Sequence, residues 1–214
     1  MVLVRDELDP FPLNRNTDPI PAPDKTALAE RPAARQSTGG KLASPLMAGF
    51  YDWLAAQNYI RQYALNPNPA YRLFSDVGGD CTNFVSQVMG AGGWVDRPGP
   101  YLDWNNWWYN ALNQTRSWTY THAFQQFFNT SGRGQFLSYL TDMWIGDVMQ
   151  IDFWADTTID HAMLVDDKIS STLDGIFMSY HTNNTYHRPL SDILAIYPIP
   201  GNNYWAEHPI GTNP

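Results

Sequence analysis

The chain of 214 residues contains one cysteine, no long apolar run and few positive charges. A single cysteine excludes an internal disulfide, so this thiol is either a buried structural group or a nucleophile. The 13 lysine and arginine residues stand against 21 acidic residues, and the net charge of −8 disfavours nucleic acid and anionic lipid as partners. No stretch approaches the roughly 18 consecutive apolar residues of a transmembrane helix, so we expect no membrane insertion.

The first residues also lack the apolar core of a secretory signal peptide. Three expectations about location therefore remain open: the protein stays in the cytoplasm, it is exported by a route that needs no such signal, or the sequence has been trimmed. Residues 1–43 are rich in proline, aspartate, asparagine and alanine and predict an extended arm. Residues 44–214 predict one folded domain. A toxin delivered against a rival's cell wall is one hypothesis for this arrangement, with the arm as its export or docking segment.

Apolar spacing predicts helices in the first half of the domain and strands in the second. We expect one helix from Ser44-Pro45 to about residue 64 and a second from Asp80-Cys81 to Gly92-Gly93. Further helices are expected over 121–128 and 135–140, and strands over 148–153, 161–165 and 176–180. Helices followed by strands indicate an α+β fold in which helices pack on an antiparallel sheet.

Cys81 lies in the octapeptide DCTNFVSQ, at the predicted first turn of an amphipathic helix. A helix N-terminus carries a charge of about +0.5, which favours the thiolate and predicts a lowered pKa for Cys81. The backbone N–H groups of that turn are also suited to stabilising an oxyanion. A small buried thiol remains the structural alternative.

A thiol nucleophile needs an imidazole base and a third polar group that orients the ring. His161 opens one predicted strand and His181 closes the next. If the two strands form a hairpin, the start of the first lies beside the end of the second, and the two histidines become neighbours. We predict His181 rather than Asn183 as the third member, because Asn183 falls in a turn-like segment.

Several motifs together resemble the putative amidase domain family, over about residues 46–200. They are Tyr63-Ala64-Leu65, Asn68-Pro69-Ala70-Tyr71, the octapeptide at Cys81, Ala91-Gly92-Gly93-Trp94, Trp118, residues 146–152, Asp160-His161-Ala162-Met163, Tyr180-His181-Thr182-Asn183 and residues 189–193. That family is similar to the papain-like cell-wall hydrolases of the NlpC and CHAP types. The resemblance implies a papain-like core, with Cys81 as nucleophile, His161 as base and His181 as third catalytic residue. It also implies peptide amides of peptidoglycan as substrate and no cofactor.

Four further residues are candidates for substrate binding: Asp80, Asn83, Trp107 and Asn183. Trp107 belongs to the segment Trp-Asn-Asn-Trp-Trp-Tyr at 104–109, which is suited either to stacking on a substrate or to packing within a loop. The polar residues are suited either to a cleft or to a solvated face. Endopeptidase and N-acetylmuramoyl amidase activities both remain open, as does the oligomeric state.

Two other kinds of function remain as alternatives. A metal-dependent amidase would use His161, His181 and His187, because zinc takes about three protein ligands in a catalytic site. This alternative leaves the context of Cys81 unexplained, and no His-Glu-x-x-His motif is present. A non-catalytic module that binds the cell wall or a partner through its many aromatic residues is the other alternative.

Overall fold

The computed structural model describes residues 50–74, 80–199 and 202–211, and these form an α+β fold around one antiparallel sheet. The predicted arm over 1–43 and the predicted helix start at Ser44-Pro45 lie outside the described residues. Within them, the sheet has six strands in the order β1-β6-β2-β3-β4-β5. The strands are β1 (Gly134–Leu137), β2 (Val148–Asp152), β3 (His161–Lys168), β4 (Ile176–Tyr180), β5 (Thr185–Pro189) and β6 (Asn203–Pro209).

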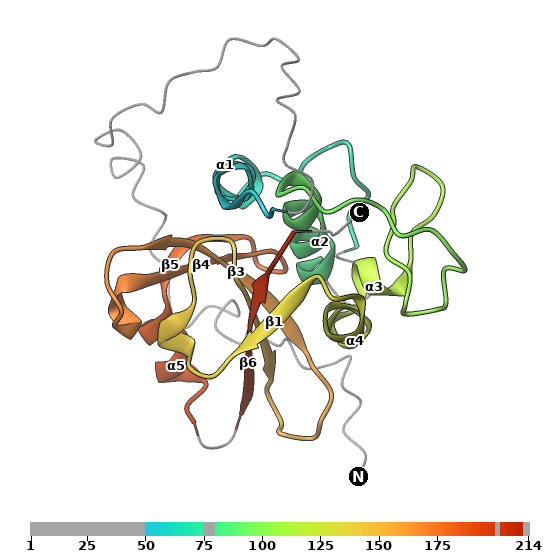
Figure 1. Cartoon of the computed structure of the whole chain (residues 1–214). Helices are drawn as coiled ribbons and strands as arrows, with labels where there is room; N and C mark the ends of the chain where they lie inside the picture. Colours follow the sequence, from blue (N-terminus) through green and yellow to red (C-terminus); the bar gives the residue numbers. More distant parts are fainter. Residues whose placement is uncertain (1–49, 75–79, 200–201, 212–214) are drawn as a thin grey trace, which may run out of the picture.

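Helices cover both faces of this sheet (Figure 1). They are α1 (Trp53–Tyr63), α2 (Cys81–Ala91), α3 (Arg116–Thr119), α4 (Thr121–Ser131) and α5 (Leu190–Ile196), with short 3-10 turns η4 (Leu140–Asp142) and η5 (Leu173–Gly175). Helices α1, α2 and α4 pack on one face, and α5 packs on the other. Strand alternation separates the two faces, because successive side chains of a strand point in opposite directions.

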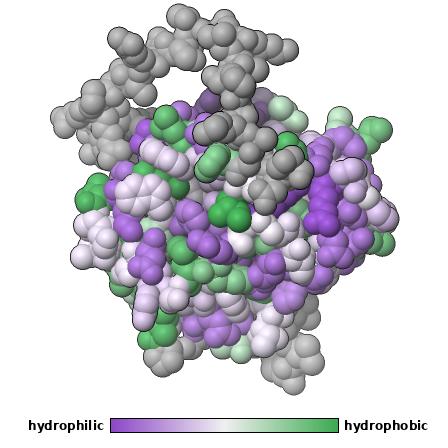
Figure 2. Space-filling model, in the orientation of Figure 1, coloured by the Kyte–Doolittle hydropathy of each residue, from purple (hydrophilic) through white to green (hydrophobic). Residues whose placement is uncertain are grey.

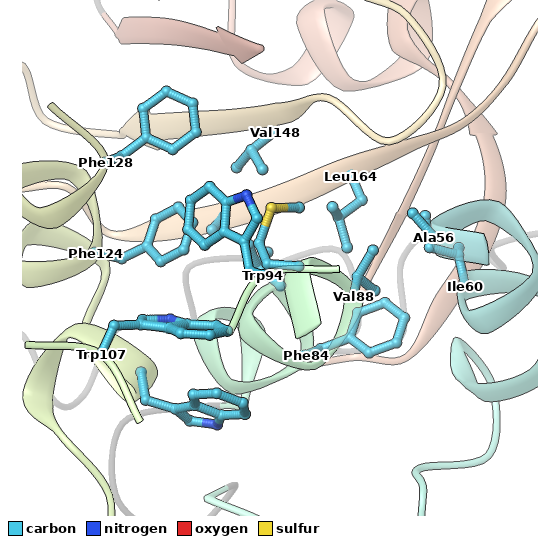
Figure 3. Close-up of a cluster of buried hydrophobic side chains, with 14 of the residues drawn as sticks. Ala56, Ile60, Phe84, Val88, Trp94, Trp107, Phe124, Phe128, Val148 and Leu164 are labelled. Carbon is cyan, nitrogen blue, oxygen red and sulfur yellow. The ribbon is translucent and has the colours of Figure 1, made fainter. Parts of the chain in front are cut away.

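The face under α1, α2 and α4 carries an aromatic core (Figure 3). Val148 and Leu164 point from the sheet toward Phe84 and Val88 of α2, and several aromatic rings fill the space beside them. The opposite face is rich in methionine and isoleucine instead. Its buried residues include Met149, Ile151, Met163, Val165, Ile176, Met178, Leu190 and Ile193.

The second predicted helix is confirmed, and the first begins at Trp53 within the described residues. Helix α2 starts at Cys81 and ends at Ala91, directly before the Gly92-Gly93 pair. Helix α1 starts only at Trp53, because Asp52 caps it: its side chain accepts a hydrogen bond from the N–H of Ala55 at 2.9 Å.

In the second half, the strands at 148, 161 and 176 are confirmed, but the helix expected over 135–140 is wrong. Residues 134–137 form strand β1, which pairs with β6 from Gly134↔Pro209 to Leu137↔Ala206. A partner about 70 residues away in the sequence supplies the hydrogen bonds of this short strand, so its own periodicity carries little signal. Strands β5 and β6 and helix α5 were not predicted.

The visible surface shows no separation into a polar and an apolar side. Hydrophilic and hydrophobic residues are interspersed on the face drawn in Figure 2. Across the described part of the chain, no helix has the length and apolar character needed to cross a membrane.

Candidate active site

Cys81 is the first residue of α2 and is almost buried, with 5% of its surface exposed. The backbone N–H groups of Ala162 and Thr82 donate to its sulfur, and the Thr82 hydroxyl lies 3.7 Å from it. Helix α2 packs against β3, so the thiol reaches the start of that strand. Ala162 directly follows His161 in β3, and the structure thereby brings the predicted nucleophile to the backbone beside the predicted base.

The start of β3 is suited to receive the thiol because it extends beyond the end of β4. The ladder between β3 and β4 begins at Leu164↔Ser179, although β3 itself begins at His161. Strand β2 continues to pair along this segment, through Gln150↔Ala162 and Ile151↔His161. The first residues of β3 are therefore paired with β2 alone, and α2 packs on the sheet face that carries Ala162 and Leu164.

His161 is buried among aromatic rings, with 1% of its surface exposed. Its ring makes an edge contact with Tyr180 at 5.3 Å between centroids and a stacked contact with Phe153 at 6.4 Å. Removal from water disfavours the charged ring and lowers the pKa of His161 to about 3. The imidazole is therefore neutral near pH 7, which is the form that accepts a proton.

The prediction of a lowered thiol pKa is wrong for this structure. Burial raises the pKa of Cys81, and the nearby Asp80 carboxylate adds to the rise. The hydrogen bonds from Ala162 and Thr82 act in the opposite direction but do not offset the burial. The periodicity of α2 could not reveal this, because burial of its first residue depends on β3.

His181 lies at the end of β4 and holds Asp80. Its Nδ1 is 2.7 Å from an Asp80 carboxylate oxygen, and its Nε2 is 3.0 Å from the carbonyl oxygen of Tyr63. The ring also stacks on Phe84 of α2, at 3.9 Å between centroids. The ring is thus held between a carboxylate on one side and a backbone carbonyl on the other.

The two histidines face opposite sides of the sheet. Continuing the register from Leu164↔Ser179 places His181 level with Ala162, so its side chain shares the face of Ala162 rather than that of His161. The contacts agree: His181 meets Phe84 of the aromatic core, and His161 meets Tyr180 of the other core. The register pairs His181 with Ala162, one residue away from His161, and this puts the two histidine rings on opposite faces. The order of the strands in the sequence could not reveal this difference.

Asn183 lies in the tight turn between β4 and β5, as its sequence indicated. Thr182 and Asn183 both have positive φ, at 60° and 67°. Paired left-handed residues of this kind make a two-residue hairpin turn. This turn brings the Thr182 hydroxyl to the backbone N–H of Asp80, 2.8 Å away. Thr182, Tyr180 and the carbonyl of Tyr63 are site residues that the sequence analysis missed, because only the hairpin places them.

The other predicted binding residues make internal contacts. One carboxylate oxygen of Asp80 accepts hydrogen bonds from the N–H of Phe74 and the amide of Asn83. Asn83 also donates to the carbonyl of Arg72 and accepts from the Trp118 indole. Trp107 is 1% exposed and packs in the aromatic core, so of its two alternatives the structure supports packing. Substrate binding by Asp80, Asn83 and Asn183 stays a prediction.

The three histidines of the metal alternative do not converge. His187 lies on β5 and contacts Asp166 at 2.7 Å, while His181 contacts Asp80 and His161 contacts aromatic rings. In the part of the chain that the structure describes, no group of three or more His, Cys, Asp or Glu side chains is arranged to hold a metal ion.

Fold and site together define a class: an α+β domain with a cysteine at a helix start, packed against a strand that begins with histidine. Residues 50–202 match the family model described as the putative amidase domain, and the chain belongs to that family. The name of the family refers to amide hydrolysis. The chain is 33% identical to uncharacterized protein YhbB of Bacillus subtilis (strain 168) over 118 residues, 54% of this chain and 37% of YhbB.

A second relative is uncharacterized protein YjcM of the same organism, with 30% identity over 150 residues. This match covers 65% of the present chain and 32% of YjcM. The chain thus spans about a third of the length of the curated relatives it matches. No solved structure matches the chain.

Proposed function

We propose that this domain hydrolyses amide bonds through a covalent thioester on Cys81, with His161 as general base and then general acid. The observation that carries the proposal is the contact between the Cys81 sulfur and the backbone N–H of Ala162, the residue after His161. This contact brings the only thiol of the chain to the strand that begins with His161, whose buried imidazole is neutral near pH 7. Both groups lie at the ends of regular elements, which hold them in place.

In this mechanism the resting pair is an uncharged thiol and an uncharged imidazole. As sulfur attacks the carbonyl carbon, the thiol proton passes to His161, and the C–N bond then breaks as His161 returns that proton to the leaving amine. Water, deprotonated by His161, attacks the thioester and releases the acid and the free thiol. In this proposal, backbone N–H groups of the first turn of α2 stabilise the oxyanion of both steps.

The same geometry supports a papain-like core, in which a helix carrying the nucleophile packs on an antiparallel sheet carrying the base. The sequence resemblance to cell-wall hydrolases supports peptide amides of peptidoglycan as the substrate. The amide-hydrolase family supports this reaction type over a binding module.

The test is incubation with purified cell-wall fragments, followed by mass spectrometry of the products. Four samples separate the alternatives: wild type, Cys81→Ser, wild type treated with iodoacetamide, and wild type treated with a chelator. We expect new amine and carboxylate ends only in the untreated and chelator-treated wild type. Cleavage that survives both changes at Cys81 but stops with the chelator would instead support a metal-dependent amidase.

A further inference from the structure

The contacts of Asp80 are unusual for a residue that directly precedes a helix. Asp80 occupies the N-cap position of α2, where an aspartate side chain normally accepts hydrogen bonds from the first turn. Here its side chain makes no capping hydrogen bond. One oxygen is engaged by Phe74 and Asn83, and the other faces His181.

His181 is fixed from three sides, so it can hold this carboxylate in place. The Tyr63 carbonyl at the end of α1 accepts from one ring nitrogen, and Phe84 of α2 stacks on the ring face. The next residue of the hairpin turn, Thr182, accepts the backbone N–H of Asp80. The end of α1, the turn after β4 and the start of α2 therefore meet at the Asp80–His181 pair, which is buried and only one residue from the nucleophile.

We propose that His181 is a positioning residue, which holds the Asp80 carboxylate away from the first turn of α2 so that this turn and the Cys81 thiol stay available to substrate. His181 then acts on the nucleophile through Asp80 and does not orient His161. This inference rests on the proposed function of Cys81 and assigns a different role to His181 from that of a third catalytic residue.

Without His181, the Asp80 carboxylate loses its hydrogen-bond partner and becomes free to turn toward the helix N-terminus, where aspartate is favourable. A negative charge there disfavours the thiolate and occupies the N–H groups that the oxyanion needs. Loss of His181 is therefore expected to make Cys81 less reactive. A purely structural role predicts the opposite for the thiol, because a loosened α2 would expose a group that is now 5% exposed.

The experiment measures the rate of Cys81 alkylation by iodoacetamide at pH 7.5, by mass spectrometry of the intact full-length protein. The chain has no other cysteine, so one added group reports one site. We expect His181→Ala to slow alkylation between about 10-fold and 100-fold, the range that small misplacements at a reactive centre produce. Faster alkylation in His181→Ala would overturn the proposal. His208→Ala is the matched control, since His208 also contacts an aspartate at 2.7 Å but on β6.

Two conservative variants and a double mutant test the route through Asp80. The amide of His181→Asn can replace the Nδ1 donor toward Asp80, whereas that of His181→Gln can replace the Nε2 donor toward Tyr63. We expect Asn to restore reactivity more than Gln, and His181→Ala to have no further effect in an Asp80→Asn background. A reversed ranking, or independent effects in the double mutant, would contradict the route through Asp80.

Circular dichroism and urea unfolding identify any variant that fails to fold. If His181→Ala is such a variant, the ranking of His181→Asn against His181→Gln decides whether the proposal holds.

Alkylation needs no substrate, so this test separates the two proposals. If the cell-wall assay shows no role for Cys81, the alkylation ranking still measures whether His181 controls the thiol. If the ranking fails while Cys81→Ser abolishes cleavage, the nucleophile stands and the positioning role falls.

Discussion

His161 and His181 are the same residue type, both are buried, and they lie on neighbouring strands, yet their surroundings are opposite. His161 contacts the rings of Phe153 and Tyr180, and burial holds its pKa at about 3. His181 has a carboxylate on one nitrogen and a carbonyl on the other. One region holds a neutral imidazole among aromatic rings, and the other holds an imidazole between two oxygen atoms.

The difference shows that burial alone does not set the role of a histidine. Desolvation disfavours the charged ring of His161, whereas His181 is equally buried and lies between two oxygen atoms. The face of the sheet on which each ring lies decides which surroundings it meets. Two buried histidines on neighbouring strands can therefore have different contacts and different proposed roles.

The largest effect on turnover should come from replacing the Cys81 thiol, on which both proposed histidine roles depend. Cys81→Ser should lower the turnover of cell-wall fragments by more than about 1000-fold, because a hydroxyl is a far weaker nucleophile at this site. The measurement is product formation over time, with circular dichroism to confirm the fold. Turnover within 10-fold of wild type would remove the thiol from the mechanism.

The next effect distinguishes the proposed role of His161 from that of His181. His161→Ala should lower kcat by about 100- to 10,000-fold, the usual contribution of a general base. Under the same conditions, we expect His181→Asn to retain much more activity, because it keeps a donor toward Asp80. The comparison breaks down if the two variants are equally impaired.

Acid should lower the free energy of unfolding through the protonation of His161. The pKa of His161 is about 3 in the folded protein against an ordinary value of 6.5, so the unfolded chain binds the extra proton first. Its stability contribution is therefore complete above pH 6.5 and is lost as the pH falls toward 3, by up to about 1.4 kcal/mol per pH unit. Urea unfolding at several pH values should show a shallower acid dependence in His161→Gln. Parallel curves for wild type and variant would contradict the assignment.

The smallest effect is expected at His208, which contacts Asp147 at 2.7 Å but is 38% exposed. The hydrogen bond to Asp147 raises the pKa of His208. The pH dependence of its stability contribution is therefore opposite to that of His161. Its contribution is present below the ordinary histidine pKa and is lost as the pH rises through the raised value. We expect His208→Asn to cost less than about 1 kcal/mol in urea unfolding at pH 6, because solvent screens the pair. A cost of several kcal/mol would show that exposure does not distinguish it from the buried pair.

The sequence by itself determined the elements whose signals are local. The apolar face of residues 81–91 and the glycines after it define α2, and alternation defines β2, β3 and β4. Cys81 at a helix start and His161 at a strand start follow from the same patterns. Local patterns are therefore enough to predict that both side chains lie at the ends of regular elements in an α+β fold.

Tertiary structure alone decided how these residues meet and what charge they carry. The thiol is buried because α2 packs on β3, and the burial raises its pKa against the effect of the helix N-terminus. His181 meets Asp80 rather than His161 because the β3–β4 register places the two rings on opposite faces. Register and burial arise from contacts between distant segments, so no local pattern specifies them.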